Sequence, residues 1–143
     1  MGFDKIHETT KPGDFVLSRK NAPLAKICMR LLRHNVRAMI EGKDLGRALL
    51  TVIKNLRARS MPDFMEKLTI WENLTVERLM ATKKKSAEAA IDLVHDKAET
   101  LRQLAEDMDS VQVLSDFVAA LFTETPNGKA DYVVCSSVHK AKG

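Results

Sequence analysis

Residues 15–34 read Phe-Val-Leu-Ser-Arg-Lys-Asn-Ala-Pro-Leu-Ala-Lys-Ile-Cys-Met-Arg-Leu-Leu-Arg-His, and this stretch decides how the chain begins to fold. The apolar run Phe15–Ser18 is typical of a short buried strand. From Pro23 to His34, apolar residues recur at steps of three and four positions, with Lys and Arg between them, which predicts an amphipathic helix. Pro23 suits the first turn, because the N–H that it lacks would have no partner there. A strand followed by a helix is therefore expected.

Helical patterns continue through the middle of the chain. We expect a second strand over residues 35–40, and then a helix to Leu56 with Asp44 as its N-cap. Ser60–Asp63 has the spacing of a capping box, with Asp in place of Glu, at the start of a helix that reaches Met80. A long helix is predicted over residues 86–108. Asp109-Ser110 offers an N-cap for a last helix, which Pro126-Asn127-Gly128 brings to an end.

The chain closes with another apolar strand, Tyr132–Cys135, followed by the polar and basic residues Ser-Ser-Val-His-Lys-Ala-Lys-Gly at 136–143. Strand-like segments therefore stand at both ends, with helices between them. This order predicts an α+β protein, mostly α, in which a helical domain is inserted into an α/β domain. The expected boundaries are residues 1–42 for the first α/β part, 43–128 for the helical insertion and 129–143 for the return strand.

Positive charge is concentrated in the first half of the chain. The net charge is +4, but residues 18–60 hold eleven Lys and Arg against two acids, which gives +9. Residues 61–128 hold seven basic and thirteen acidic residues, which gives −6. If the protein binds nucleic acid, the first third should provide most of the attraction to phosphate. A basic face is expected to join residues of two predicted helices: Arg30, Arg33, Arg37, Arg47, Lys54, Arg57 and Arg59.

Several classes of site find no support in the sequence. The two Gly-Lys pairs, Gly42-Lys43 and Gly128-Lys129, lack the glycine five positions upstream and the following Ser or Thr of a Walker A loop. Neither the two cysteines nor the four histidines have metal-ligand spacing, so we predict no metal site and two ordinary buried thiols. No apolar run is long enough to cross a membrane and the start is polar, so a cytoplasmic or nucleoid-associated protein without membrane contact is expected.

The residues after the last strand carry a resemblance to a known family. They are similar to motif V of superfamily 1 DNA helicases, Thr-x-His-x-Ala-Lys-Gly-Leu-Glu, with matches in register at Ser137, His139, Ala141, Lys142 and Gly143. A second match is Val16–Leu24, which resembles the strand and loop of the helicase 2A domain, where an aromatic residue or Ser precedes Arg-x-Asn-Ala. The two segments occur in this order in UvrD/Rep-like helicases, on either side of the helical 2B insertion. The sequence therefore resembles a 2A/2B fragment of such a helicase, with partial RecA-like elements at both ends.

The resemblance implies a role in translocation along single-stranded DNA and in duplex unwinding. DNA-backbone contacts are implied for Arg19, Asn21, Ser137 and His139, and a position toward the nucleotide cleft for Lys142 and Gly143. ATP and Mg²⁺ are implied as cofactors of the intact parent protein, and none for this fragment, which lacks Walker A and B and should not hydrolyse ATP alone. The implied partners are single-stranded DNA, duplex DNA through the basic face, and the N-terminal RecA-like lobe.

One alternative from another class stays open at this stage. The chain would then be a small helical protein-interaction module, whose basic first third meets an acidic partner, and it would have no ATPase or DNA role. Trp71, the only tryptophan, is expected in the core beside Leu68 and Leu74 rather than as a platform for base stacking.

Overall fold

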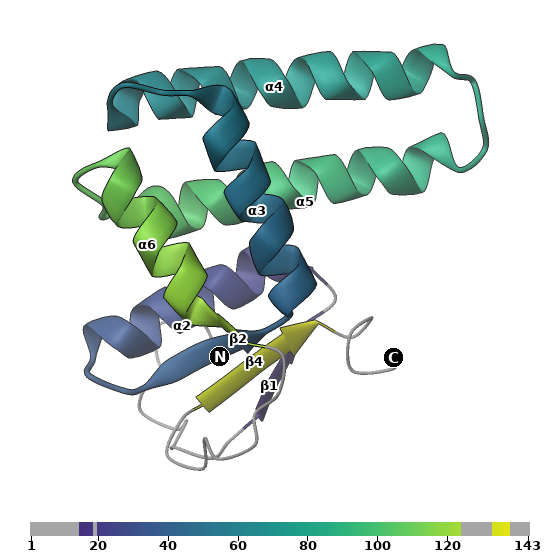
Figure 1. The fold of residues 1–143 in the computed structure, drawn as a ribbon. Coiled ribbons are helices and arrows are strands. Elements are labelled where there is room, and N and C mark those ends of the chain that lie inside the picture. The colour runs from purple at the N-terminus through teal and green to yellow at the C-terminus, as the bar shows by residue number, and fades with distance from the viewer. Residues whose placement is uncertain (1–14, 19, 124–132, 138–143) are drawn as a thin grey trace.

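The computed structural model describes residues 15–18, 20–123 and 133–137 of the chain (Figure 1). The described part is mostly helical and has one parallel sheet, which confirms the predicted α+β, mostly α, class. The elements follow in the order β1 (Phe15–Ser18), α2 (Asn21–Arg33), β2 (Ala38–Glu41), α3 (Lys43–Leu56), α4 (Met61–Ala81), α5 (Ala87–Ala105), α6 (Val111–Leu121), β3 (Phe122–Thr123) and β4 (Val133–Ser137).

The sheet brings the two predicted end strands together. Its strand order is β1-β4-β2-β3, so β4, the last strand along the chain, lies between β1 and β2. All three pairings are parallel. Residues 38–40 of β2 are all buried, which is the pattern of a strand covered on both faces. The strands β1 and β4, which lead into the two segments that carried the sequence resemblance, are thus neighbours in one sheet.

The helices are arranged in layers above this sheet. α2 contacts β1, β2 and β4, and it also packs against α5. Figure 1 shows α4 and α5 as a long hairpin that lies across the end of the molecule opposite to the sheet. α3 packs against α4 and α6, and both α3 and α6 reach β3. α2 therefore lies between the sheet and the hairpin.

One continuous buried core joins these layers. It includes side chains from every described helix and from β2, β3 and β4. Among its fully buried members are Leu24 of α2, Leu49 of α3, Phe64 of α4 and Leu101 of α5. Burying one such side chain contributes about 1.5–3 kcal/mol. Trp71 is partly buried and packs against this core, as expected, with Leu68 fully buried, but Leu74 is 46% exposed and lies outside the core. Residues of all three predicted segments share the core, and their division into a 2A-type and a 2B-type part stays a prediction.

Two of the predicted helix starts are confirmed in atomic detail. The Ser60 hydroxyl accepts from the Asp63 N–H at 3.2 Å, and the Asp63 carboxylate accepts from the Arg59 N–H at 2.9 Å. The first bond is the one that the capping-box spacing indicated, whereas Asp63 reaches back to the N–H of Arg59, one residue before the N-cap, instead of to that of Ser60. At α6, the Ser110 hydroxyl accepts from the Val113 N–H at 3.2 Å. Side-chain caps therefore fix the starts of α4 and α6.

The start of α3 differs from the prediction. Gly42, not Asp44, is its N-cap residue, and Asp44 lies in the first turn without making a capping bond. Gly42 has φ of +142°, a conformation that side chains rarely permit, so glycine is required there. Asp44 still places a negative charge at the positive end of the helix dipole.

Two strands also differ from the prediction. β2 begins only at Ala38, because Asn35 adopts a left-handed conformation with φ of 62° and continues the turn after α2. β3 was not predicted, since it is only the pair Phe122–Thr123 directly after α6. It pairs with β2 where α3 comes close, and a Cβ added to Gly46 would lie 2.7 Å from the Cβ of Phe122.

Both cysteines of the chain lie within the described residues. Cys28 and Cys135 are free and buried, as predicted. A hydrogen bond between the two thiols, together with burial, raises the pKa of Cys28 well above its ordinary value. Across the described ranges, no helix is both long and apolar enough to cross a membrane.

Candidate nucleic-acid interface

The carboxyl ends of β1 and β4 lie side by side. The two strands pair in parallel from Phe15 with Val134 to Ser18 with Ser137. Ser18 and Ser137 are 119 positions apart in the chain, yet they are partners at the same edge of the sheet. In open parallel sheets, ligands bind outside the carboxyl ends of the strands, where the following loops gather. This edge is therefore the candidate interface.

Only two of the six predicted site residues, Asn21 and Ser137, lie within the described residues. Ser137 is the last residue of β4, and Asn21 is the first residue of α2. The structure thus brings together Ser137 and the segment that leads into Asn21. Arg19, His139, Lys142 and Gly143 lie outside the described residues.

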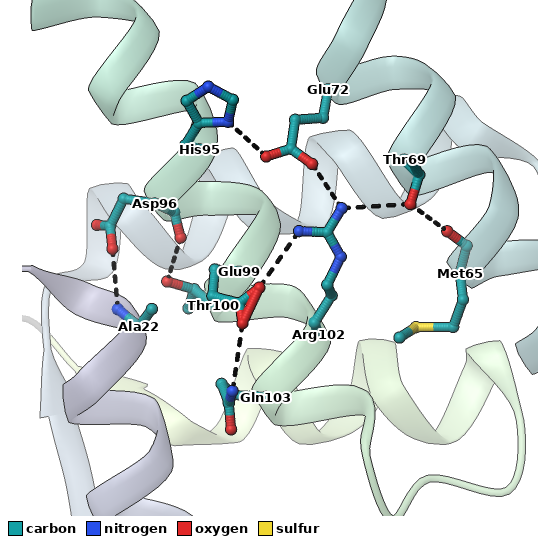
Figure 2. A network of polar contacts seen from close by, with 10 residues as sticks. All are labelled: Ala22, Met65, Thr69, Glu72, His95, Asp96, Glu99, Thr100, Arg102 and Gln103. Carbon is teal, nitrogen blue, oxygen red and sulfur yellow. Dashed lines mark hydrogen bonds and ion pairs between the residues drawn. The ribbon is translucent and has the colours of Figure 1, made fainter.

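Asn21 is held by an acid from the helical hairpin. Its backbone N–H and its side-chain Nδ2 both donate to Oδ2 of Asp96, each at 3.0 Å. The backbone N–H of Ala22 donates to Oδ1 of the same carboxylate at 3.0 Å (Figure 2). Asp96 lies on α5 and is only 8% exposed. One buried carboxylate therefore binds the start of α2 through three hydrogen bonds.

The predicted basic face divides into two groups in the structure. On α3 and the turn after it, Arg47, Lys54, Arg57 and Arg59 are exposed. On α2, Arg33 donates from Nε to the Asp107 carboxylate at 2.7 Å, so an acid partly neutralises it. Exposed cations on a surface helix can attract phosphate over roughly a Debye length, about 8 Å at physiological salt. The α3 group provides the stronger positive surface.

The second group of cations borders a hollow between α2 and α5. The hollow measures about 320 Å³ and is lined by Lys26, Met29, Arg30, Arg33, Gln103 and Glu106. Glu106 lies among these cations, and Asp107 next to it in the chain pairs with Arg33. Such a mixture of charges offers no strong attraction to a phosphate group.

A polar network joins α4 to α5 away from the sheet (Figure 2). Arg102 donates from Nη2 to Glu72 Oε1 at 2.5 Å and from Nη1 to Glu99 Oε1 at 3.3 Å. His95 Nδ1 lies 2.6 Å from Glu72 Oε2. Burial alone would raise the pKa of Glu72, but the hydrogen bonds from Arg102 and His95 outweigh it and hold this pKa below its ordinary value. Because the ionised carboxylate can only accept, Nδ1 of His95 carries a proton.

Neither Asp96 nor Glu72 was predicted from the sequence. Both lie in helices whose apolar positions already account for the observed pattern, so their burial leaves no separate signal. Asp96 is buried because α5 contacts α2 on one side and α4 on the other. Only the three-dimensional packing shows which acids are enclosed.

Within the residues that the structure describes, no group of three or more His, Cys, Asp or Glu side chains is placed to hold a metal ion. The two Gly-Lys pairs lack Walker A spacing. No protein-family model, no curated protein and no solved structure matches this chain.

Proposed function

We propose that this chain is part of an ATP-dependent helicase of the UvrD/Rep type, in which it grips the backbone of single-stranded DNA at the carboxyl ends of β1 and β4. The observation that carries the proposal is the register of Ser18 with Ser137. Two sequence segments that each resemble a helicase motif are expected to act on the same strand of DNA, and the strands β1 and β4, from which they continue, end at the same edge of the sheet. A parallel sheet with α2 connecting β1 to β2 is also compatible with part of a RecA-like domain.

The residue types proposed for this edge suit contacts with the sugar–phosphate backbone of DNA. Ser, His, Lys, Arg and Asn donate hydrogen bonds to phosphate oxygens without selecting a base. A motor that moves along a strand requires such contacts, since it must hold every sequence equally. The proposed contacts are Arg19, Ser137 and His139, with Lys142 and Gly143 toward the nucleotide cleft; Asn21, which the resemblance also implies, is bound to Asp96. ATP and Mg²⁺ belong to other parts of the parent protein in this proposal.

The exposed cations of α3 give the proposed protein a second surface. Arg47 and Lys54 lie on α3, the helix that directly follows β2 in the chain, and Arg57 and Arg59 lie in the turn after it. Duplex DNA ahead of the gripped strand is the partner proposed for them, held by phosphate contacts alone. Substitution of these residues by neutral ones would then weaken binding to duplex DNA more than binding to single-stranded DNA.

The test is fluorescence-anisotropy binding of the chain to a labelled single strand across a salt series. The variants are Arg19→Ala and His139→Ala, and Lys84→Ala at the exposed tip of the α4–α5 hairpin is the matched loss of charge. Both variants should weaken binding, and loss of the Arg19 charge should also reduce the slope of log affinity against log salt by about 0.7 for a single strand. Lys84→Ala should leave both unchanged. Absence of binding at low salt would remove the DNA role and favour the helical interaction module.

A further inference from the structure

Asp96 caps a helix to which it does not belong. The N-cap residue of α2, Lys20, makes no side-chain capping bond, and the first turn of α2 contains no acid. The N–H groups of Asn21 and Ala22 have no partners within the helix, because they precede its first full turn. Pro23 has no N–H at all. Asp96 satisfies both free donors from α5, 75 positions away from Asn21 along the chain.

The carboxylate also engages the side chain that the sequence assigned to DNA. Asn21 Nδ2 donates to Asp96 Oδ2 at 3.0 Å, so one of its two N–H donors is used inside the protein. The amide oxygen cannot bind a phosphate oxygen, since both are acceptors. Asn21 is therefore better placed to hold the backbone than to contact DNA with its full donor capacity.

Asp96 is itself fixed by its surroundings. It is only 8% exposed, and its two carboxylate oxygens accept from the backbone N–H groups of Asn21 and Ala22. Charge-assisted bonds from backbone N–H groups to a buried carboxylate are among the strong hydrogen bonds of proteins. The start of α2, three positions after the end of β1, is thus tied to the hairpin by bonds of defined geometry.

We propose that Asp96 is a positioning residue of the DNA interface, which holds residues 20–22 at the carboxyl end of the sheet, and that Asn21 acts through Asp96 rather than by contact with DNA. This inference rests on the proposed DNA-binding function. It predicts an effect opposite in sign to simple electrostatics. Removal of an acid raises the net charge and should by itself tighten binding to DNA. Loss of a positioning residue should weaken it.

The experiment compares single-strand affinity of the wild-type chain with Asp96→Asn, Asp96→Ala, Asn21→Ala and the double variant Asn21→Ala/Asp96→Ala. We expect Asp96→Asn to weaken binding by about tenfold, the scale of one lost charge-assisted bond. The double variant should bind no more weakly than Asp96→Ala, because both changes break one unit. Asp92→Ala removes an exposed acid from the same helix and should leave affinity unchanged or slightly higher.

A stability control separates positioning from general damage. Thr100→Val removes a buried hydrogen bond from the same turn and leaves the Asp96 carboxylate in place. It should lower the free energy of unfolding without weakening DNA binding. Hydrogen exchange at the amides of Asn21 and Ala22 should accelerate in Asp96→Asn and not in Thr100→Val.

The outcomes distinguish the two proposals. An affinity of Asp96→Asn for single-stranded DNA that equals or exceeds that of the wild-type chain would overturn the positioning role alone. Effects of Asn21→Ala and Asp96→Ala that simply add would also overturn it, and would make Asn21 a direct contact. Failure of the wild-type chain to bind at low salt would overturn the proposed function, and the positioning role with it.

Discussion

Glu72→Gln is the substitution that probes the α4–α5 hairpin most directly. The Glu72 side chain is 11% exposed, and its two oxygens accept from Arg102 and His95 at 2.5 and 2.6 Å. The amide of Gln keeps the shape but removes the charge and replaces one acceptor with a donor. Hydrogen bonds to charged groups are worth about 1.5–3 kcal/mol each, and part of this remains through the Gln oxygen. We therefore expect a loss of about 2 kcal/mol in the free energy of unfolding at pH 7.

The pH dependence provides a second, independent prediction. The pKa of Glu72 in the folded protein lies below its ordinary value of 4.5. The folded state therefore favours the ionised carboxylate, and this contribution to stability is fully present above pH 4.5 and is lost as the pH falls through the folded pKa. The stability difference between wild type and Glu72→Gln should shrink as the pH falls below 4.5 and through the folded pKa of Glu72. His95, Glu99 and Arg102 surround the same carboxylate and are unchanged in both proteins.

Urea unfolding followed by circular dichroism measures both quantities. The matched control is Glu77→Gln, an exposed glutamate on the same helix, which should change the free energy of unfolding by less than about 0.5 kcal/mol. The slope with urea should be equal in all three proteins, so that the midpoints compare stability alone. Equal stability of wild type and Glu72→Gln at pH 7, or a difference that grows as the pH falls below 4.5, would refute the reasoning.

Three further changes test separate parts of the fold. Gly46→Ala places a methyl group against Phe122 and should cost about 1–3 kcal/mol in urea unfolding, although alanine favours helices; an increase in stability would contradict the close approach of α3 to β3. Arg57→Gly should raise stability by up to about 1 kcal/mol, because Arg57 has φ of 50° at the end of α3, and a loss would show that its side chain matters more than its backbone. Iodoacetamide should label Cys28 and Cys135 at least about tenfold more slowly in the native protein than in urea, because both thiols are buried and the pKa of Cys28 is raised; equal rates would place them at the surface.

The regular elements of the fold were predictable from local patterns. The helices from Asn21, Met61, Ala87 and Val111 follow apolar spacing and short capping signals such as Ser60 with Asp63, which act within a few residues. The α3 start was misassigned, because Asp44 and Gly42 both carry helix-start signals and only the backbone conformation decides between them.

The arrangement of the elements was less accessible. Strand pairing depends on contacts between distant residues, so the insertion of β4 between β1 and β2 has no local signal. The two-residue strand β3 is too short to show a period. The predicted basic face forms two groups in the structure, because Arg33 donates a hydrogen bond to the carboxylate of Asp107, 74 positions later in the chain.

For the candidate site, the sequence predicted individual DNA-binding residues, and the structure adds which residues lie beside those that it describes. The resemblance selected Asn21 and Ser137, and the β1–β4 pairing brings their two segments to one edge. Asp96 could not be recognised, since a single acid in an amphipathic helix is usually exposed. Its burial follows from the contact of α5 with α2, which no pattern within α5 encodes.

The most direct test of the central claim is to map where a single strand binds, by two-dimensional amide NMR of the chain during titration with an oligonucleotide. The proposal predicts that the largest shift changes cluster at the carboxyl ends of β1 and β4, at Ser18, at residues 20–22 and at Ser136 and Ser137. Changes concentrated at the lysine-rich tip of the hairpin, residues 83–85, or no changes at low salt, would contradict it.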